Sequence, residues 1–196
     1  MSSRDLMLAA LRRNAPAASS LPELPAAIVY HHPQKQFAEA FTSVGGKFIR
    51  VARREEINPE LERIEAYAQA RKIASLLPGI GRSNVDLNAL KDPHELEGLD
   101  VAIIAGEFGV AENGAVWVPG SALGPQRAIF VVTQHLVLVV PESEIVHTMH
   151  QAYDRIRFAG LGFGTFISGP SKTADIEQAL VIGAHGARSC TLFLVG

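Results

Sequence analysis

The residues best suited to chemistry lie close together near the C-terminal end of the sequence, in the stretch 166–186. A polar turn there places Ser168, Gly169, Ser171 and Lys172 within five residues. Hydroxyl groups, backbone N–H groups and one cation suit a small anionic ligand, such as a hydroxy acid, a phosphate or the oxygen of a thioester. Because turns use the same residue types for conformational reasons, a strand and turn without chemistry is the alternative.

An imidazole follows this turn in the segment 183–186, which reads Gly-Ala-His-Gly. His185 is the candidate for catalytic proton exchange, because an imidazole titrates near neutral pH. Between the two segments, Thr173 is suited to cap a helix with Asp175 and Glu177 in its first turn. Thr173, Asp175 and Gly186 complete the candidate ligand-binding residues of this stretch.

A carboxylate candidate lies upstream, in a polar break between two apolar runs. Here the sequence reads Val-Ala-Glu-Asn-Gly-Ala at 110–115. Glu112 is a candidate nucleophile or base, with Asn113 and Gly114 as ligand-binding neighbours. The structural alternative is that Glu112 accepts backbone N–H bonds and fixes the turn, and the sequence does not separate these two roles.

The elements that must position these residues alternate between helix and strand. This alternation predicts an α/β fold with a mostly parallel sheet and helices on both faces. We expect the polar segments to meet at the carboxyl ends of the strands, where open α/β sheets bind ligands. Residues 1–25 are predicted to form a helix and a linker, and residues 26–196 the α/β domain. The expected helices are 2–13, 33–44, one beginning at Asn58, and 141–158; the expected strands are 26–30, 47–52, 73–77, 100–105, 115–118, one within 127–140, and 191–195.

Composition excludes several classes of function. The net charge of −2 offers no electrostatic basis for nucleic-acid binding. The single Cys190 rules out an internal disulfide framework and argues against an iron–sulfur cluster held by this chain alone. His147 and His150 lie three residues apart but lack a third ligand nearby, so no metal site is predicted. Since no targeting signal or membrane span is evident, we expect a cytoplasmic protein with no membrane partner.

Two motifs resemble a known family. The run Ser-Gly-Pro-Ser-Lys-Thr-Ala-Asp-Ile-Glu at 168–177, followed by Gly-x-His-Gly at 183–186, resembles the lactate-utilisation protein C family, also called the LUD domain. The segment 110–115 is similar to the family's upstream motif, and the resemblance extends over roughly residues 84–196. Asn113 replaces the family's usual Thr, and Ala187 its usual Pro; either difference bears on a local turn or a ligand contact.

The resemblance implies a fold and two possible functions. The fold would be the one shared by ribose-5-phosphate isomerase, glucosamine-6-phosphate deaminase and CoA transferases. Family members work with two iron–sulfur proteins in cytoplasmic oxidation of L-lactate to pyruvate, so this chain would be the cluster-free component and the clusters would lie on its partners. The triplet 112–114 also resembles the Ser-Glu-Asn-Gly motif of one group of CoA transferases. The alternative is therefore an independent enzyme with Glu112 as nucleophile or base.

Overall fold

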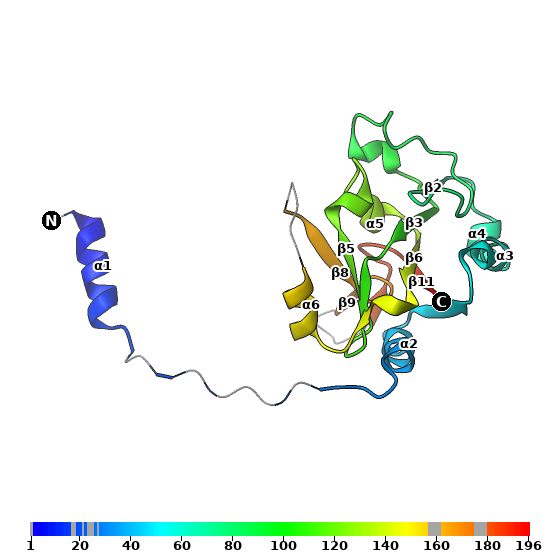
Figure 1. Cartoon of the computed structure of the whole chain (residues 1–196). Coiled ribbons are helices and arrows are strands. Elements are labelled where there is room, and N and C mark those ends of the chain that lie inside the picture. The colour runs from blue at the N-terminus through cyan, green and yellow to red at the C-terminus, as the bar shows by residue number, and fades with distance from the viewer. Residues whose placement is uncertain are drawn as a thin grey trace.

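A five-stranded, entirely parallel sheet forms the centre of the protein (Figure 1). The structure, a computed structural model, describes residues 2–16, 19–20, 22, 26, 28–156, 162–174 and 180–196. The strand order is β1-β11-β6-β3-β2, and every neighbouring pair is parallel. These strands are β1 (Lys47–Val51), β2 (Ile73–Ser75), β3 (Val101–Ala105), β6 (His135–Pro141) and β11 (Ser189–Val195). The predicted mostly parallel sheet is confirmed.

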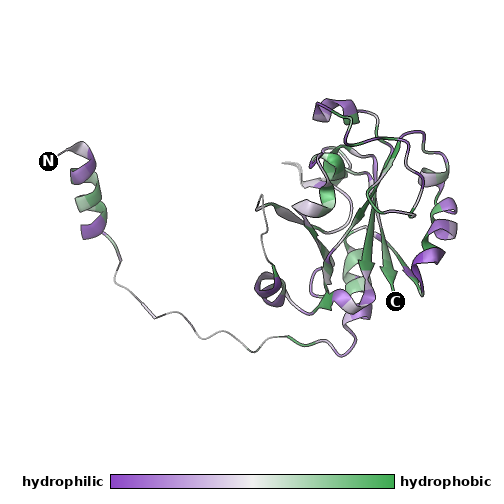
Figure 2. Cartoon of the chain, turned by 45° about the horizontal axis from the view of Figure 1, so that its top comes forward, coloured by the Kyte–Doolittle hydropathy of each residue, from purple (hydrophilic) through white to green (hydrophobic). Residues whose placement is uncertain are grey.

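Both faces of this sheet are covered, which explains why its central strands β3, β6 and β11 are mostly apolar. On one face, Val101 and Ile103 pack with residues of α3 (Ile57–Glu62) and α4 (Glu65–Ala68). On the other face, Ala102 and Ile104 pack with α2 (Pro33–Ser43), α5 (Ile129–Val132) and a second sheet. Figure 2 shows the central strands as predominantly hydrophobic and much of α3 and α4 as hydrophilic.

The second sheet has four strands in the order β7-β4-β5-β8. Its strands are β4 (Phe108–Val110), β5 (Ala115–Pro119), β7 (Ile145–Val146) and β8 (Gly164–Ile167). Trp117 of β5 and Phe166 of β8 lie with ring centroids 4.9 Å apart. They share an apolar cluster with Ala152 and Ile156, so α6 (Met149–Arg155) covers the outer face of this sheet.

The single helix predicted over 141–158 is wrong. After a short 3-10 turn, Ile145 and Val146 instead form β7 and pair with Gly109 and Val110 of β4. Thr148 then caps the shorter helix α6, accepting a hydrogen bond from the Gln151 N–H. The apolar spacing of this stretch is typical of a helix. Two of the predicted helical residues are strand residues instead, because they pair with the otherwise open edge of β4.

The helix predicted to begin at Thr173 is also wrong where the structure describes it. Residues 172–174 form β9 (Lys172–Ala174), which pairs antiparallel with β10 (Leu180–Ile182). Asp175 and Glu177 lie outside the described residues. The described residues of 26–30 form no strand. Asn58 lies inside α3 rather than at its cap, and its side chain binds the Gly79 carbonyl and the Gly81 N–H.

The N-terminal helix is confirmed as α1 (Ser3–Arg13). Ser2 and Asp5 form the predicted capping box at its start. None of its residues is buried, and Figures 1 and 2 draw it well apart from the rest of the chain. The division of the chain at residue 25 stays a prediction. In the part of the chain that the structure describes, no helix has both the length and the apolar character needed to cross a membrane.

Candidate functional site

The polar turn at 168–172, which we call the signature turn, is fastened by its own lysine. The Lys172 Nζ donates to the carbonyl oxygens of Val44 at 2.9 Å, Ser168 at 3.0 Å and Pro170 at 3.0 Å. Val44 is the C-cap residue of α2, so the cation also lies at the negative end of that helix. The lysine thereby ties the signature turn to a segment more than a hundred residues away.

These three bonds define what Lys172 offers a ligand. An ammonium group has only three N–H donors, and here three backbone oxygens lie within hydrogen-bond distance of it. Partial burial lowers the pKa of Lys172. Lys172 therefore supplies a positive field to its surroundings, but in this arrangement it has no unused N–H for a bound anion.

Backbone hydrogen bonds hold the His185 segment against the signature turn. The Ser171 N–H donates to the Ala187 carbonyl at 2.9 Å, and the Gly183 N–H donates to the Ser171 carbonyl at 2.9 Å. Gly186 lies so close that a Cβ there would be 3.0 Å from the Ser171 Cβ. The predicted association of His185 and Gly186 with the signature turn is thus present.

A cavity of about 340 Å³ opens between these two segments. Its polar wall includes Ser168, Ser171, Lys172 and His185. The remaining wall is largely apolar, and it is formed by residues such as Phe130, Val131, Leu136, Phe166 and Ile167. A volume of this size accommodates a small organic acid, with polar groups on one side and apolar contacts on the other.

The cavity lies at the amino edge of the parallel sheet, contrary to the expected carboxyl edge. Leu136 stands near the start of β6, and Ala187 immediately precedes the last strand, β11. The reason is that the signature turn follows β8, which belongs to the second sheet. The rule that places ligands at carboxyl ends concerns loops following strands of the parallel sheet. We call this space the amino-edge cavity.

Glu112 is fixed by a helix end. Its Oε2 accepts a hydrogen bond of 2.8 Å from the N–H of Met149, the first residue of α6, and its own N–H donates to the His147 carbonyl at 3.1 Å. This is the arrangement expected if Glu112 stabilises its turn. Glu112 is exposed and does not line the amino-edge cavity. Its catalytic role stays a prediction.

The upstream turn at 111–114 nevertheless contacts the signature turn. The Ser168 hydroxyl donates to the Asn113 carbonyl at 3.0 Å, so the two family motifs meet. The Asn113 Oδ1 accepts from the Ala115 N–H at 3.0 Å, which closes the turn locally. Gly114 has φ +67°, and a Cβ there would be 2.5 Å from the Phe41 nitrogen. Asn113 and Gly114 therefore fix the conformation and close packing of the upstream turn, and they do not line the cavity.

Thr173 lies outside this cavity. Thr173 uses its hydroxyl in a cross-strand bond to the Val181 carbonyl at 3.4 Å, and Asp175 is outside the described residues. A separate glycine-bearing loop, residues 79–84, is a structural turn: the Gly81 N–H donates to the Asn58 Oδ1, and the Arg82 N–H donates to the Tyr67 hydroxyl. Within the described ranges, no group of three or more His, Cys, Asp or Glu residues is placed to hold a metal ion.

Comparison with known proteins gives the chain's relatives. The LUD domain model matches residues 34–195. The chain is 38% identical to lactate utilization protein C of Shouchella clausii over 92 residues, which is 44% of this chain and 40% of the relative. It is 34% identical to the protein of the same name from Geobacillus kaustophilus, covering 60% of this chain and 48% of the relative. For the Bacillus subtilis protein of that name the identity is 32%, covering 71% and 61%.

The chain therefore spans about half the length of the curated relatives that it matches. Among solved structures, a DUF162 family protein from Deinococcus radiodurans is similar, with a TM-score of 0.59 and 16% sequence identity. The match covers 87% of this chain and 100% of that chain. At this identity the similarity establishes the fold alone, and it agrees with the α/β architecture described above.

The three hydrogen bonds from Lys172 to the carbonyls of Val44, Ser168 and Pro170 form what we call the lysine clamp, and replacing Lys172 tests it. Lys172→Met should lower the free energy of unfolding by about 2 kcal/mol, because three carbonyls lose a charged donor. Lys172→Arg should not restore stability, since a planar guanidinium cannot reproduce the three directions of an ammonium. Urea denaturation measures both effects. The buried Cys190 is a second reporter, because burial raises the pKa of its thiol to about 12 and so keeps it unreactive. Its labelling by a thiol reagent should become about tenfold faster in Lys172→Met, because local opening exposes the thiol.

The matched control is Lys35→Met, which removes an exposed lysine whose ion pair with Glu39 is 3.8 Å long. This variant should match the parent protein in stability and in the labelling of Cys190. If Lys172→Met proved as stable as Lys35→Met, the clamp would have no measurable strength.

Gly114→Ala tests the contact between the upstream turn and α2. It should cost about 3 kcal/mol of unfolding free energy, because a left-handed backbone and a clash with the backbone of α2 act together. Gly79→Ala is the control: Gly79 has φ +75° but no atom within 4 Å of its added Cβ, so only about 1 kcal/mol should be lost. Equal losses in urea denaturation would mean that the close approach to Phe41 has no energetic weight.

Proposed function

This chain belongs to the LUD domain family, and from that membership we propose that it is the cluster-free component of a cytoplasmic system that oxidises L-lactate to pyruvate. Support comes from the family match over residues 34–195 and from relatives named lactate utilization protein C. In this role the chain binds a small carboxylic acid, and partner proteins carry out the electron transfer.

We propose the amino-edge cavity as the binding site. Lys172 supplies a positive field that suits the carboxylate of the acid. Ser171 and His185 offer a hydroxyl and an imidazole for the hydroxyl oxygen on the carbon next to that carboxylate. Val131 and Leu136 on the apolar side suit a methyl group. The observation that supports this assignment most directly is the pair of Ser171 backbone bonds, which hold the His185 segment beside the lysine clamp.

Redox chemistry requires partners in this proposal. Oxidation of L-lactate to pyruvate removes two electrons and two protons from the substrate. The chain has one cysteine, Cys190, and it is buried, whereas iron–sulfur clusters are commonly held by four cysteines. We therefore place the clusters on iron–sulfur partner proteins, which accept both electrons. The hydroxyl proton passes to His185, and the proton of the substrate carbon passes to a base of a partner protein.

The alternative, an independent enzyme on a CoA-transferase-like fold, depends on Glu112. Its carboxylate is exposed, as a nucleophile must be to meet a thioester, but one oxygen is occupied by the Met149 N–H. A covalent acyl group on Glu112 after incubation with acyl-CoA, located by mass spectrometry, would favour this alternative. Full function of Glu112→Ala in the lactate assay below would end any catalytic role for the residue.

Growth on L-lactate tests the proposed function. Deletion of this chain alone should abolish growth on L-lactate while growth on pyruvate continues. Rescue should succeed with the parent sequence and fail, or fall at least about tenfold in rate, with His185→Gln, because general acid–base groups contribute factors of this size or larger. Ser171→Ala should weaken rescue through loss of one hydroxyl donor.

The matched control is His150→Gln, which changes an exposed histidine outside the cavity wall and should rescue growth fully. Purification of the chain with iron–sulfur proteins from lactate-grown cells provides a second measurement. Normal growth on L-lactate without the chain would separate it from lactate use, and equal rescue by His185→Gln and His150→Gln would remove the amino-edge cavity from the reaction.

A further inference from the structure

A second cavity, of about 380 Å³, opens at the opposite edge of the parallel sheet. Ser75 and Ala105, the last residues of β2 and β3, form its floor. Its walls come from the loop 85–88 and from the segment 121–125. The carboxyl edge is where open parallel sheets bind ligands, and neither family motif contributes to this site. We call it the carboxyl-edge cavity.

Side-chain bonds fix the near end of the loop that forms one wall. The Asn84 Oδ1 accepts from the Ile73 N–H at 2.8 Å, and its Nδ2 donates to the Arg71 carbonyl at 2.6 Å. Ser83 accepts a further bond from the Ser75 N–H at 3.2 Å. The loop therefore begins from a position held directly against the start and end of β2.

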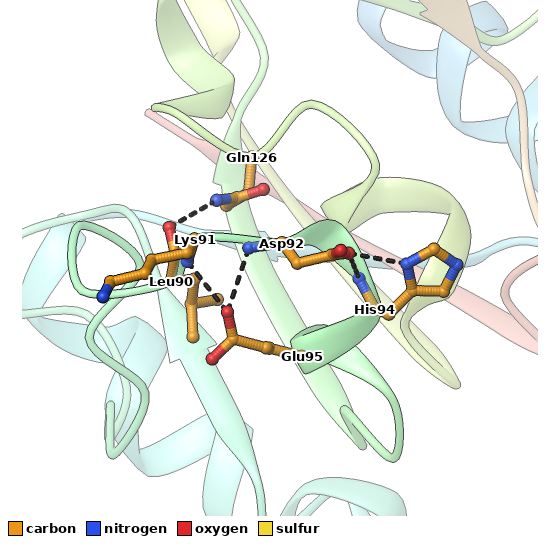
Figure 3. Close-up of polar contacts among 6 residues, drawn as sticks. All are labelled: Leu90, Lys91, Asp92, His94, Glu95 and Gln126. Carbon is orange, nitrogen blue, oxygen red and sulfur yellow. Dashed lines mark hydrogen bonds and ion pairs between the residues drawn. The ribbon is translucent and has the colours of Figure 1, made fainter.

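The far end of the loop is fixed as well (Figure 3). Gln126 is only 7% exposed, and its Nε2 donates to the Leu90 carbonyl at 3.2 Å, which ties the two walls together. The Glu95 Oε1 accepts from the N–H groups of Lys91 and Asp92 at 2.8 and 2.9 Å. Because both ends of the loop are held, the cavity is formed before any ligand binds, which lowers the entropy cost of binding.

The polar groups of this cavity differ in kind from those of the amino-edge cavity. Among the described residues, no Lys, Arg or His lines it, and Asp86 is the one charged residue of its lining. The Asp86 Oδ1 accepts from the Asn88 N–H at 3.0 Å. Within the described part of the chain, the Asp86 Oδ2, the Asn88 carboxamide and the Ser121 hydroxyl have no protein partner. A carboxylate without a neighbouring cation repels phosphates and carboxylates and favours groups that donate hydrogen bonds.

From this lining we propose that the carboxyl-edge cavity binds the nucleoside moiety of a ligand. A ribose offers two adjacent hydroxyls that can donate to the Asp86 carboxylate, the pairing that acidic residues make with ribose at carboxyl edges of other α/β sheets. Leu76, Val85 and Leu87 provide apolar contacts for a flat base. The moiety belongs either to a free nucleoside or to the nucleoside end of a dinucleotide whose phosphates extend out of the cavity.

This inference is independent of the proposed function. The two cavities lie at opposite edges of the sheet, and none of their lining residues is shared. Loss of nucleoside binding would therefore leave the lactate assignment untouched, and loss of the lactate assignment would leave this site intact.

Calorimetric titration of the purified 196-residue chain tests the inference, with adenosine and guanosine as probes. At least one nucleoside should bind, and its 2′,3′-dideoxy analogue should bind at least tenfold more weakly. Asp86→Ala should produce the same loss. Ser121→Phe, which fills the cavity from an exposed position, should abolish binding even if Asp86→Ala disturbs its loop. Glu39→Ala removes an exposed carboxylate on α2, outside the cavity wall, and should bind as the parent does.

Two further probes separate the sources of the nucleoside. Tighter binding of NAD than of adenosine, with the same dependence on Asp86, would support a dinucleotide ligand; equal or weaker binding of NAD would support a free nucleoside. Absence of nucleoside binding at millimolar concentration would overturn the inference, as would binding unchanged in both Asp86→Ala and Ser121→Phe. Binding of spermidine without binding of any nucleoside would identify a site for amines and would overturn it equally.

Discussion

The bonding of one ammonium group to three carbonyls determines how the polar segments of this protein meet. Lys172 joins the end of α2 at Val44 to two oxygens of the signature turn. Hydrogen bonds to a charged group stabilise by about 1.5–3 kcal/mol each when well formed, and solvent exposure reduces that value. Since Ser171 in the same turn binds the Gly183 and Ala187 backbones, the His185 segment is indirectly held by this lysine as well. The cation therefore acts chiefly on the architecture of the site, and reaches a ligand through its field.

The presence of two sheets explains why the family motifs gather at the amino edge. Ligand sites of parallel sheets form from loops that leave the carboxyl ends of the strands. The signature turn leaves β8, a strand of the second sheet, whose antiparallel pairing with β5 directs its end toward the start of β6 and β11. The carboxyl edge of the parallel sheet is left to a different set of residues, with a different charge. One sheet thus presents two chemically distinct cavities at its two edges.

The sequence predicted the parallel sheet well and its surroundings less well. Val101–Ala105 and the segment 192–195 of β11 are continuous apolar runs, a pattern that depends on burial alone. The stretch 141–158 has the apolar spacing of a helix, whereas in the structure Ile145 and Val146 pair with the edge of β4. That edge becomes evident only when the pairing of strands distant in the sequence is known.

The candidate site was predictable in its residue types and less so in its contacts. Ser171, Lys172, His185 and Gly186 do line one cavity, because their motif spacing brings them to adjacent segments. The acceptors outside the signature turn are the backbone carbonyl of Val44 for Lys172 and that of Asn113 for Ser168. Every residue has such a carbonyl, so no residue type marks it in the sequence. The link between the upstream turn and the signature turn is for that reason visible only in the fold.

The two departures from the family pattern leave these contacts intact. The Asn113 Oδ1 accepts from the Ala115 N–H, and a threonine hydroxyl at this position can accept the same bond. Ala187 contributes its carbonyl, which accepts from the Ser171 N–H; a proline retains its carbonyl and lacks only the N–H. Neither substitution therefore removes a bond that builds the amino-edge cavity. Val131, an exposed residue of the cavity lining, is a position at which a substitution can alter the ligand without removing a hydrogen bond of Lys172.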